Sequence, residues 1–204
     1  MSAPMVKGWC PGAHRPMMSG DGLVVRIRPR LGRLSASAAL QLFDLAEIFG
    51  NGVIDVTTRA NLQIRGVDAG AHPILLDRLI DAGLVDADPV IDARRNIVAT
   101  PFWQPDDLTD RLGLALDAAL PSFPDMPAKI GYALDTGPAA MLREVSADFR
   151  IETGDDTPLI LRADGADRGV RVTEESVIDA LAEMVDWFIR SSGAESGRMA
   201  RHLT

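Results

Sequence analysis

The chain has 204 residues, of which 47% are hydrophobic and 25% are charged, and it carries a net charge of −8. These values fit one large globular domain or two small ones. The negative charge argues against a nucleic-acid partner, which binds clustered Lys and Arg. No apolar run reaches the ~20 residues of a membrane helix, so no membrane segment is expected.

The cysteine content and the N-terminal residues predict a cytoplasmic protein. The first residues lack the apolar core of a signal peptide. Cys10 is the single cysteine, which excludes an internal disulfide. It also excludes a zinc or iron–sulfur site built from thiolates of this chain alone, because such sites normally take four protein ligands. Cys10 and His14 are spaced like a pair of metal ligands, but no third ligand is evident. They belong either to a structural arm or to a metal site.

The first part of the chain predicts a ferredoxin-like unit over residues 21–90, after an extended arm over residues 1–20 that is rich in Gly, Pro and Met. Hydrophobic alternation predicts a strand at Leu23–Arg28. Ser35 can cap a helix that runs to Phe49 and ends at Gly50. Further elements follow in chain order: a strand at Val53–Thr58, a tight connection at Arg59–Asn61, a strand at Leu62–Gly66, and a helix that starts near Pro73 and ends at Gly83. Strand, helix, strand, strand, helix is a β-α-β-β-α order.

The second part predicts a small α/β lobe over residues 91–190, so the fold class is α+β. Its expected elements are a short apolar run at Asn96–Thr100, a helix at Asp106–Leu120, strands at Lys129–Asp135, Ala147–Glu152 and Leu159–Ala163, and a helix from a Thr173 cap to Arg190. The polar residues 191–204 are expected to form a loose tail.

The predicted strands of the first part carry unexpected polar side chains. Because the two helices should pack on one sheet face and side chains alternate, the face under the helices should collect Val25, Ile27, Ile54, Val56, Leu62 and Ile64. The opposite face should collect Arg26, Arg28, Asp55, Thr57, Arg59, Gln63 and Arg65. This second face is either an ordinary solvated sheet face or a surface whose arginines bind a flat ligand with several carboxylates.

Several segments resemble one known family. "GLVVRIRPRLGRLS" followed by "GNGVIDVTTRANLQIRGV" resembles the ferredoxin-like half-domain of the sirohaem-dependent nitrite and sulfite reductases. "ARRNIVATP" and "MPAKIGYALD" resemble two later blocks of that family. The opening "GWCPGAHRPMMSGDGLVVRIRP" is most similar to the precorrin-3B synthase branch, which acts in aerobic cobalamin biosynthesis.

The resemblance implies a set of ligand-binding residues. Arg59 and Gln63 match the arginine and glutamine that line the sirohaem pocket, and Arg26, Arg95, Asn96 and Lys129 match residues near the bound anion. Two positions depart from the reductases, since Gly131 stands where a second lysine would be and Asp55 where an arginine faces the tetrapyrrole. Both departures remove positive charge, which favours the precorrin branch. With Arg65 on the same predicted face, the expected tetrapyrrole-binding set is Arg26, Arg59, Gln63, Arg65, Arg95, Asn96 and Lys129.

The resemblance also implies a second module, which pairs with this one in the family enzymes. Family enzymes contain this module twice, and the cysteines of their 4Fe-4S cluster lie in the second copy. The expected role is the N-terminal half of a precorrin-3B synthase-like oxidoreductase, which binds precorrin-3A or sirohaem beside a C-terminal half or a second copy of the module. The family chemistry in that branch is a hydroxylation with dioxygen, and the resemblance implies that the full-length enzyme holds the 4Fe-4S cluster, with sirohaem or iron as a candidate further cofactor. The alternatives are a non-catalytic tetrapyrrole-binding half-domain and a fragment of a sirohaem-dependent reductase.

Overall fold

The computed structural model describes residues 11–154 and 157–204. Contacts within the chain divide it into two compact units. The first unit comprises the chain up to Pro29 together with Leu34–Asp92, and the second comprises Arg30–Arg33 together with Ala93–Thr204. Each unit has its own hydrophobic core. Of the arm predicted for residues 1–20, residues 1–10, which include Cys10, lie outside the described residues.

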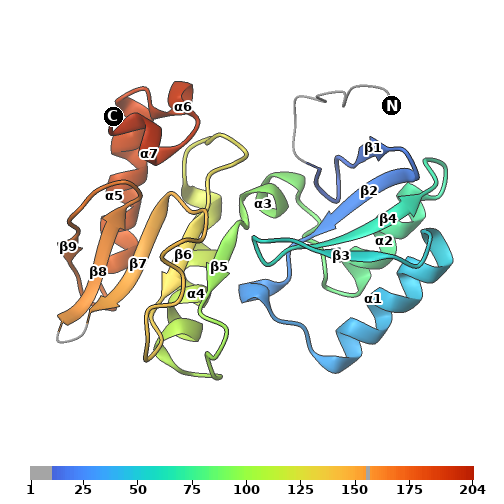
Figure 1. Cartoon of the computed structure of the whole chain (residues 1–204), viewed down its shortest axis with the longest axis horizontal. Helices are drawn as coiled ribbons and strands as arrows, with labels where there is room; N and C mark the ends of the chain where they lie inside the picture. Colours follow the sequence, from blue (N-terminus) through green and yellow to red (C-terminus); the bar gives the residue numbers. More distant parts are fainter. Residues whose placement is uncertain (1–10, 155–156) are drawn as a thin grey trace. The chain divides into compact units, whose positions relative to one another are not determined.

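The first unit contains the predicted β-α-β-β-α order (Figure 1). Its elements are β1 (Met17–Ser19), β2 (Gly22–Ile27), α1 (Ala36–Phe49), β3 (Ile54–Val56), β4 (Leu62–Val67), α2 (His72–Asp81) and the start of α3 (Pro89–Arg94). The four strands form one antiparallel sheet in the order β1-β2-β4-β3. The ferredoxin-like arrangement is thus confirmed, with β1 as an additional edge strand.

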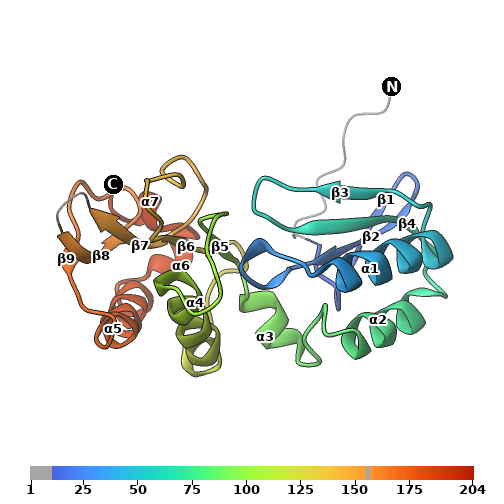
Figure 2. The same ribbon diagram turned by 90° about the horizontal axis from the view of Figure 1, so that it is seen from below.

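Local sequence signals fix the helices of this unit. The Ser35 hydroxyl accepts a hydrogen bond from the Ala38 amide at 3.1 Å, which caps α1 as predicted. Gly83, with φ of +68°, follows the end of α2 in the left-handed conformation that glycine favours. Figure 2 shows α1 and α2 on the same side of the sheet. They bury Val25, Ile27 and Ile64 beneath Leu42, Ala46, Leu75 and Leu79.

Two side chains of the first unit differ from the predicted face assignment. Val56 was expected under the helices, but it is 79% exposed because β3 ends there at the sheet edge. Arg28 was expected on the opposite, polar face. Instead it is buried just beyond the end of β2, and its Nη1 donates to Asp92 Oδ2 of α3 at 2.9 Å. Burial of a guanidinium is tolerated here because its charge is paired.

The second unit is a five-stranded mixed sheet in the order β5-β6-β7-β8-β9. Its elements are η1 (Arg30–Gly32), β5 (Ile97–Ala99), α4 (Leu108–Ala119), η2 (Leu120–Ser122), β6 (Tyr132–Asp135), β7 (Phe149–Gly154), β8 (Thr157–Ala163), β9 (Val170–Arg171), α5 (Val177–Arg190), α6 (Gly193–Ser196) and α7 (Met199–His202). β5, β6 and β7 are parallel, and β7, β8 and β9 are antiparallel.

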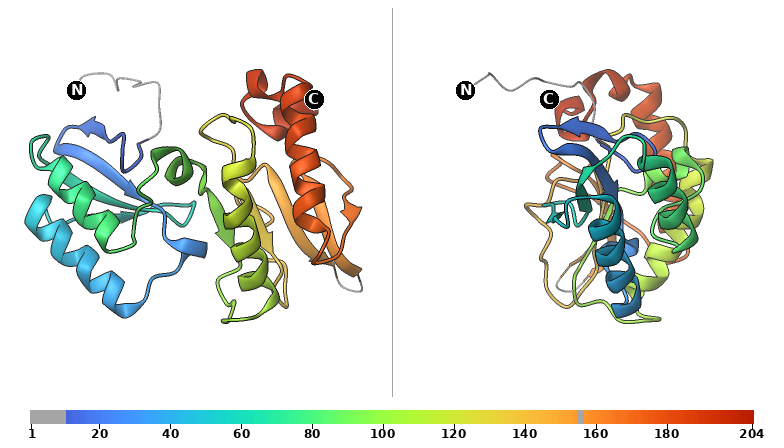
Figure 3. Two further views of the ribbon diagram at one scale, coloured as in Figure 1. Left: turned by 180° about the vertical axis from the view of Figure 1, so that it is seen from behind. Right: turned by 90° about the vertical axis from the view of Figure 1, so that its right-hand side faces the viewer.

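Two helices cover one face of this second sheet. In Figure 3 α4 and α5 lie side by side across it. Beneath them the core collects Tyr132, Leu134, Phe149, Ile151, Leu161, Leu112, Leu116, Leu181 and Phe188. The parallel pair β6 and β7 is joined by residues 136–148 without an intervening helix. This connection is hydrogen-bonded to Asp135 and Arg150, whose side chains alternate with the core residues Leu134, Phe149 and Ile151.

Two ends of the second unit differ from expectation. Helix α5, which was expected to begin at a Thr173 cap, begins at Val177. Thr173 and Ser176 hydrogen-bond each other in the turn that precedes it. Residues 191–204 were expected to be loose, yet they form α6 and α7. Met199 is completely buried in the core, and its amide donates to Asp148 at 2.9 Å. One buried methionine among polar residues is too weak a pattern to predict this docking. Within the described residues, no helix is long and apolar enough to cross a membrane.

We expect Asp92→Ala to destabilise the first unit by about 3–5 kcal/mol, because it leaves the buried Arg28 charge without its carboxylate. Urea unfolding followed by circular dichroism measures this loss. Asp77→Ala, which removes an exposed carboxylate from α2, is the matched control and should change stability by less than about 0.5 kcal/mol. Equal stabilities of the two variants would show that the buried pair contributes little.

Candidate functional site

The face of the first sheet that points away from α1 and α2 carries a row of polar side chains. Strand register places Arg26 of β2 opposite Gln63 of β4, and Gln63 opposite Asp55 of β3. The three side chains therefore share one face. We call this surface, with Arg26, Asp55, Gln63 and Arg65, the polar face. The neighbouring inward residues Val25, Ile27 and Ile64 are fully buried, as alternation requires.

Arg26 and Gln63 form a direct polar contact across β2 and β4. With the Gln63 amide turned so that its oxygen faces the guanidinium, that oxygen accepts from Arg26 Nη2 at 2.8 Å and from Nε at 3.2 Å. The amide is a neutral partner, so this contact orients Arg26 without cancelling its charge.

A β-bulge sets the direction of Arg65. Between Ile64 and Val67, which both point into the core, β4 carries two residues where β2 carries one. Gly66 of the bulge has φ of +69°, a conformation that favours glycine. Arg65 is thereby aimed across the polar face, where its Nη1 lies 3.7 Å from Asp55 Oδ2.

Asp21, in the turn between β1 and β2, completes the surroundings of Arg65. Arg65 Nη2 donates to Asp21 Oδ1 at 3.1 Å and Nε donates to Oδ2 at 3.3 Å. Nη2 also donates to the Ser19 hydroxyl at 3.0 Å. Partial desolvation would raise the pKa of Asp21, but the hydrogen bonds from Arg65, its own amide and Ser19 outweigh it and hold that pKa below its ordinary value. Asp21 is therefore ionised at neutral pH.

Arg59 lies in a turn and not on a strand, since β3 ends at Val56. The Thr57 hydroxyl accepts from the Arg59 amide at 3.4 Å and from the Asn61 amide at 3.2 Å, and Ala60 has φ of +53°. This hydrogen-bonded turn, not strand alternation, sets the position of the half-buried Arg59. Of the four candidates in the first unit, strand register brings together Arg26, Gln63 and Arg65.

The three remaining candidates belong to the second unit. Arg95 Nε donates to Asp117 Oδ1 of α4 at 2.8 Å. Asn96 donates from Nδ2 to the carbonyls of Ala93, Ala128 and Ile130, so it ties the segment before β5 to the segment before β6. Lys129 is exposed. Their assignment to a ligand stays a prediction.

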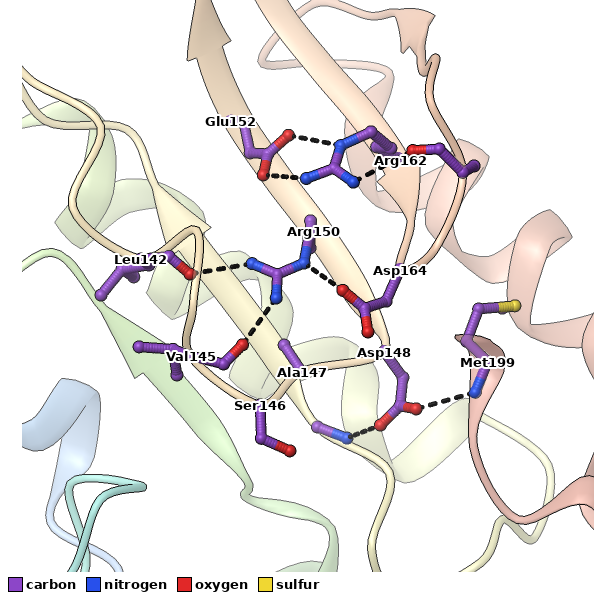
Figure 4. Close-up of polar contacts among 12 residues, drawn as sticks. Leu142, Val145, Ser146, Ala147, Asp148, Arg150, Glu152, Arg162, Asp164 and Met199 are labelled. Carbon is purple, nitrogen blue, oxygen red and sulfur yellow. Dashed lines mark hydrogen bonds and ion pairs between the residues drawn. The ribbon is translucent and has the colours of Figure 1, made fainter. Parts of the chain in front are cut away.

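The second unit has buried charged residues that sequence reasoning did not select. In Figure 4 Arg150 of β7 donates to the carbonyls of Leu142 and Val145 and to Asp164. Asp148 is completely buried and accepts hydrogen bonds from the amides of Gly131 and Met199. The alternation in "DFRIE" was the available signal, because it separates Asp148, Arg150 and Glu152 from the apolar Phe149 and Ile151.

These buried charges stabilise loops. Arg150 holds the connection 136–148 over the polar side of the second sheet from one end, and Asp135 holds it from the other by accepting from the amides of Met141 and Leu142. Arg162 and Glu152 form a bidentate pair beside them (Figure 4), which raises the pKa of Arg162. Each group is satisfied within the unit, so this network is a structural framework.

The histidines of the first unit have structural contacts. His14 Nε2 hydrogen-bonds to the Asp86 carbonyl at 2.7 Å, and His72 Nε2 to the Ala13 carbonyl at 2.8 Å. Cys10, the other member of the proposed ligand pair, lies outside the described residues. Across residues 11–154 and 157–204, no three His, Cys, Asp or Glu side chains gather as metal ligands.

Comparison with known proteins locates this unit in a family. Residues 15–82 match the nitrite/sulfite reductase ferredoxin-like half domain. A precorrin-3B synthase from Sinorhizobium sp is 34% identical over 153 residues, which cover 74% of this chain and 33% of that protein. A ferredoxin–nitrite reductase from Leptolyngbya laminosa is 30% identical over 138 residues, which cover 62% of this chain and 27% of that enzyme. The chain thus spans a third or less of these relatives' length.

A solved structure has the same fold. The Mycobacterium tuberculosis NirA protein superposes with a TM-score of 0.66 over 86% of this chain and 37% of its own, at 20% sequence identity. The sequence relatives support a related oxidoreductase family, and the solved structure shows the shared fold. The predicted resemblance is confirmed: residues 15–82 match the ferredoxin-like half domain of the nitrite and sulfite reductases.

Proposed function

We propose that the chain supplies the tetrapyrrole-binding sheet face of a precorrin-3B synthase-like oxidoreductase of cobalamin biosynthesis. The observation that carries the proposal is the row formed by Arg26, Gln63 and Asp55 on the polar face, within the half domain over residues 15–82. A flat macrocycle with carboxylate side chains suits a sheet face that presents an oriented guanidinium, because Arg binds carboxylates through a planar fork. The 34% identity to a precorrin-3B synthase favours precorrin-3A as the ligand.

In this proposal three side chains of the first unit have a defined task. Arg26 and Arg59 bind ligand carboxylates, and Gln63 orients Arg26 through its amide oxygen. The turn around Thr57 and Asn61 holds the backbone of Arg59 before a ligand arrives, which reduces the entropy lost on binding. For Arg95, Asn96 and Lys129 the proposal rests on the sequence resemblance alone.

The second candidate is a fragment of a sirohaem-dependent nitrite or sulfite reductase, favoured by the 30% identity to a ferredoxin–nitrite reductase. A third reading is a half-domain that binds the tetrapyrrole without catalytic activity. Absorbance spectra after incubation with sirohaem or with a metal-free tetrapyrrole separate the two enzyme candidates. Preference for sirohaem supports the reductase, and preference for the metal-free macrocycle supports the precorrin branch.

We expect Arg59→Ala to weaken tetrapyrrole binding about ten- to a hundredfold, since a charge-assisted hydrogen bond contributes roughly 1.5–3 kcal/mol. Arg59→Lys should recover only part of the loss, because lysine cannot make the bidentate contact. Fluorescence titration of the chain with uroporphyrin III, an octacarboxylate, measures both constants. Arg78→Ala on the exposed side of α2 is the matched control. If Arg59→Ala binds uroporphyrin III as tightly as the parent chain, the alternative of an ordinary solvated sheet face is favoured.

In this proposal the chain binds the tetrapyrrole, and the other half of the enzyme binds the 4Fe-4S cluster. The guanidinium groups fit tetrapyrrole carboxylates, whereas one cysteine cannot supply the thiolates of a 4Fe-4S cluster. The proposed cluster belongs to the other half of the enzyme, where it supplies the electron transfer.

We therefore expect the purified chain, after anaerobic reconstitution with iron and sulfide, to hold no stoichiometric cluster. Iron and acid-labile sulfide analysis measures this directly. A stoichiometry of one cluster per chain would contradict the proposal that the other half of the enzyme binds the cluster. A cluster shared by several chains would appear as a fractional stoichiometry in an oligomer, which gel filtration detects.

The proposed partner is a second module of the same type. Helix α1 exposes three large apolar side chains, Leu40 at 63%, Phe43 at 53% and Ile48 at 70%. Large apolar side chains exposed on one helix are candidates for a contact surface. The relatives extend well beyond the matched region, which supports a partner half in the complete protein.

We expect the isolated chain to self-associate at high concentration through this surface. Phe43→Asp should shift the sedimentation equilibrium toward monomer by at least about tenfold in the dimerisation constant, because it places a charge within the apolar contact. Asp77→Asn, on the exposed side of α2, is the control. A parent chain that stays monomeric at millimolar concentration would argue against the pairing surface.

A further inference from the structure

The side chain of Arg65 is occupied by oxygen atoms of its own unit. Nε and Nη2 donate to the two carboxylate oxygens of Asp21 in a bidentate arrangement, and Nη2 also reaches Ser19. Nη1 faces Asp55 at 3.7 Å. Asp21 therefore occupies the Nε–Nη2 edge of the guanidinium, and the Nη1–Nη2 edge is shared with the Ser19 hydroxyl and faces the Asp55 carboxylate, so a ligand carboxylate would compete with oxygen atoms of the protein at either edge.

The fold is built to bring Asp21 to Arg65. The turn between β1 and β2 passes so close to the bulge that a Cβ atom on Gly22 would lie 2.7 Å from the Gly66 carbonyl carbon. Gly22 has φ of +128°, which a side chain would strain. Asn51 Nδ2 adds a hydrogen bond to Asp21 Oδ2 at 3.3 Å. The position of the Asp21 carboxylate is therefore fixed by backbone geometry and by several partners.

Asp55 places a second negative charge within the row itself. It lies directly opposite Gln63, whose amide contacts Arg26, and about half of its side chain is exposed. A ligand that covers Arg26 and Gln63 therefore also meets the Asp55 carboxylate. Together Asp21, Arg65 and Asp55 carry a formal charge of −1, although Arg65 was predicted to add positive charge to this face.

We infer that Asp21 and Asp55 are specificity-determining residues of the polar face, which neutralise Arg65 and limit the number of carboxylates that a bound ligand can carry there. The inference rests on the proposed function, because it concerns the same ligand surface. Arg65 then acts as a positioning residue that holds two carboxylates, and the ligand is recognised by Arg26 and Arg59. The lowered pKa of Asp21 keeps this arrangement ionised at neutral pH.

The sign of one substitution separates this role from direct binding by Arg65. If Arg65 binds the ligand and Asp21 only positions it, Asp21→Asn weakens binding. If Asp21 competes with the ligand, Asp21→Asn releases the guanidinium and tightens binding. Loss of a merely structural contact cannot produce tighter binding, so an increase in affinity reports the electrostatic role.

The experiment titrates the chain with uroporphyrin III, an octacarboxylate, and coproporphyrin III, a tetracarboxylate, at low and high salt. Asp21→Asn and Asp55→Asn should each tighten uroporphyrin binding roughly three- to tenfold at low salt, with a smaller gain for coproporphyrin and little gain at high salt. Arg65→Ala should cost about tenfold more in the Asp21→Asn, Asp55→Asn background than in the parent, because only there is the guanidinium available. Asp77→Asn on α2 is the charge-matched control.

The outcomes distinguish the inference from the proposed function. Weaker or unchanged binding by Asp21→Asn and Asp55→Asn, in a parent that binds uroporphyrin and loses affinity with Arg59→Ala, overturns this inference alone. A parent chain that binds neither porphyrin overturns the proposed function and this inference with it. Circular dichroism of each variant confirms that the fold is retained.

Discussion

Each unit of this protein depends on the burial of one sheet face under two helices. In the first unit α1 and α2 cover β2 and β4, and in the second α4 and α5 cover β6 to β8. Since side chains alternate along a strand, this one-sided burial forces every polar strand residue to the other face. The polar face of the first sheet and the Arg150 network of the second are two results of the same constraint.

The two polar surfaces differ in how their charges are satisfied. In the second unit Arg150 is almost completely buried, and it bonds to two loop carbonyls and Asp164. Such buried charges stabilise only when fully paired, and here they hold the connection 136–148 in place. On the first sheet Arg26, Asp55, Gln63 and Arg65 are partly or largely exposed. An exposed surface with fixed geometry can exchange internal contacts for a ligand, and for this reason the proposed site is placed there.

Charge on the first sheet is more balanced than a count of its arginines suggests. Arg28 leaves the surface for a buried pair with Asp92, and Asp21 enters it through the turn between β1 and β2. The result is a patterned surface with both signs of charge. A patterned surface discriminates between ligands by the placement of their charges, whereas a uniformly cationic one attracts any polyanion.

The sequence by itself determined the local elements and the faces of the strands. Ser35 and Gly83 fixed helix ends because capping depends on neighbouring residues alone, and alternation correctly paired Arg26 with Gln63 and Arg65 on one face. Only the tertiary structure decided which partners these side chains take. Arg28 pairs with Asp92 across 64 positions and Arg65 with Asp21 across 44, and Met199 docks beside Asp148 across 51. Periodicity specifies a direction for each side chain, but contacts over such separations depend on how the whole unit packs.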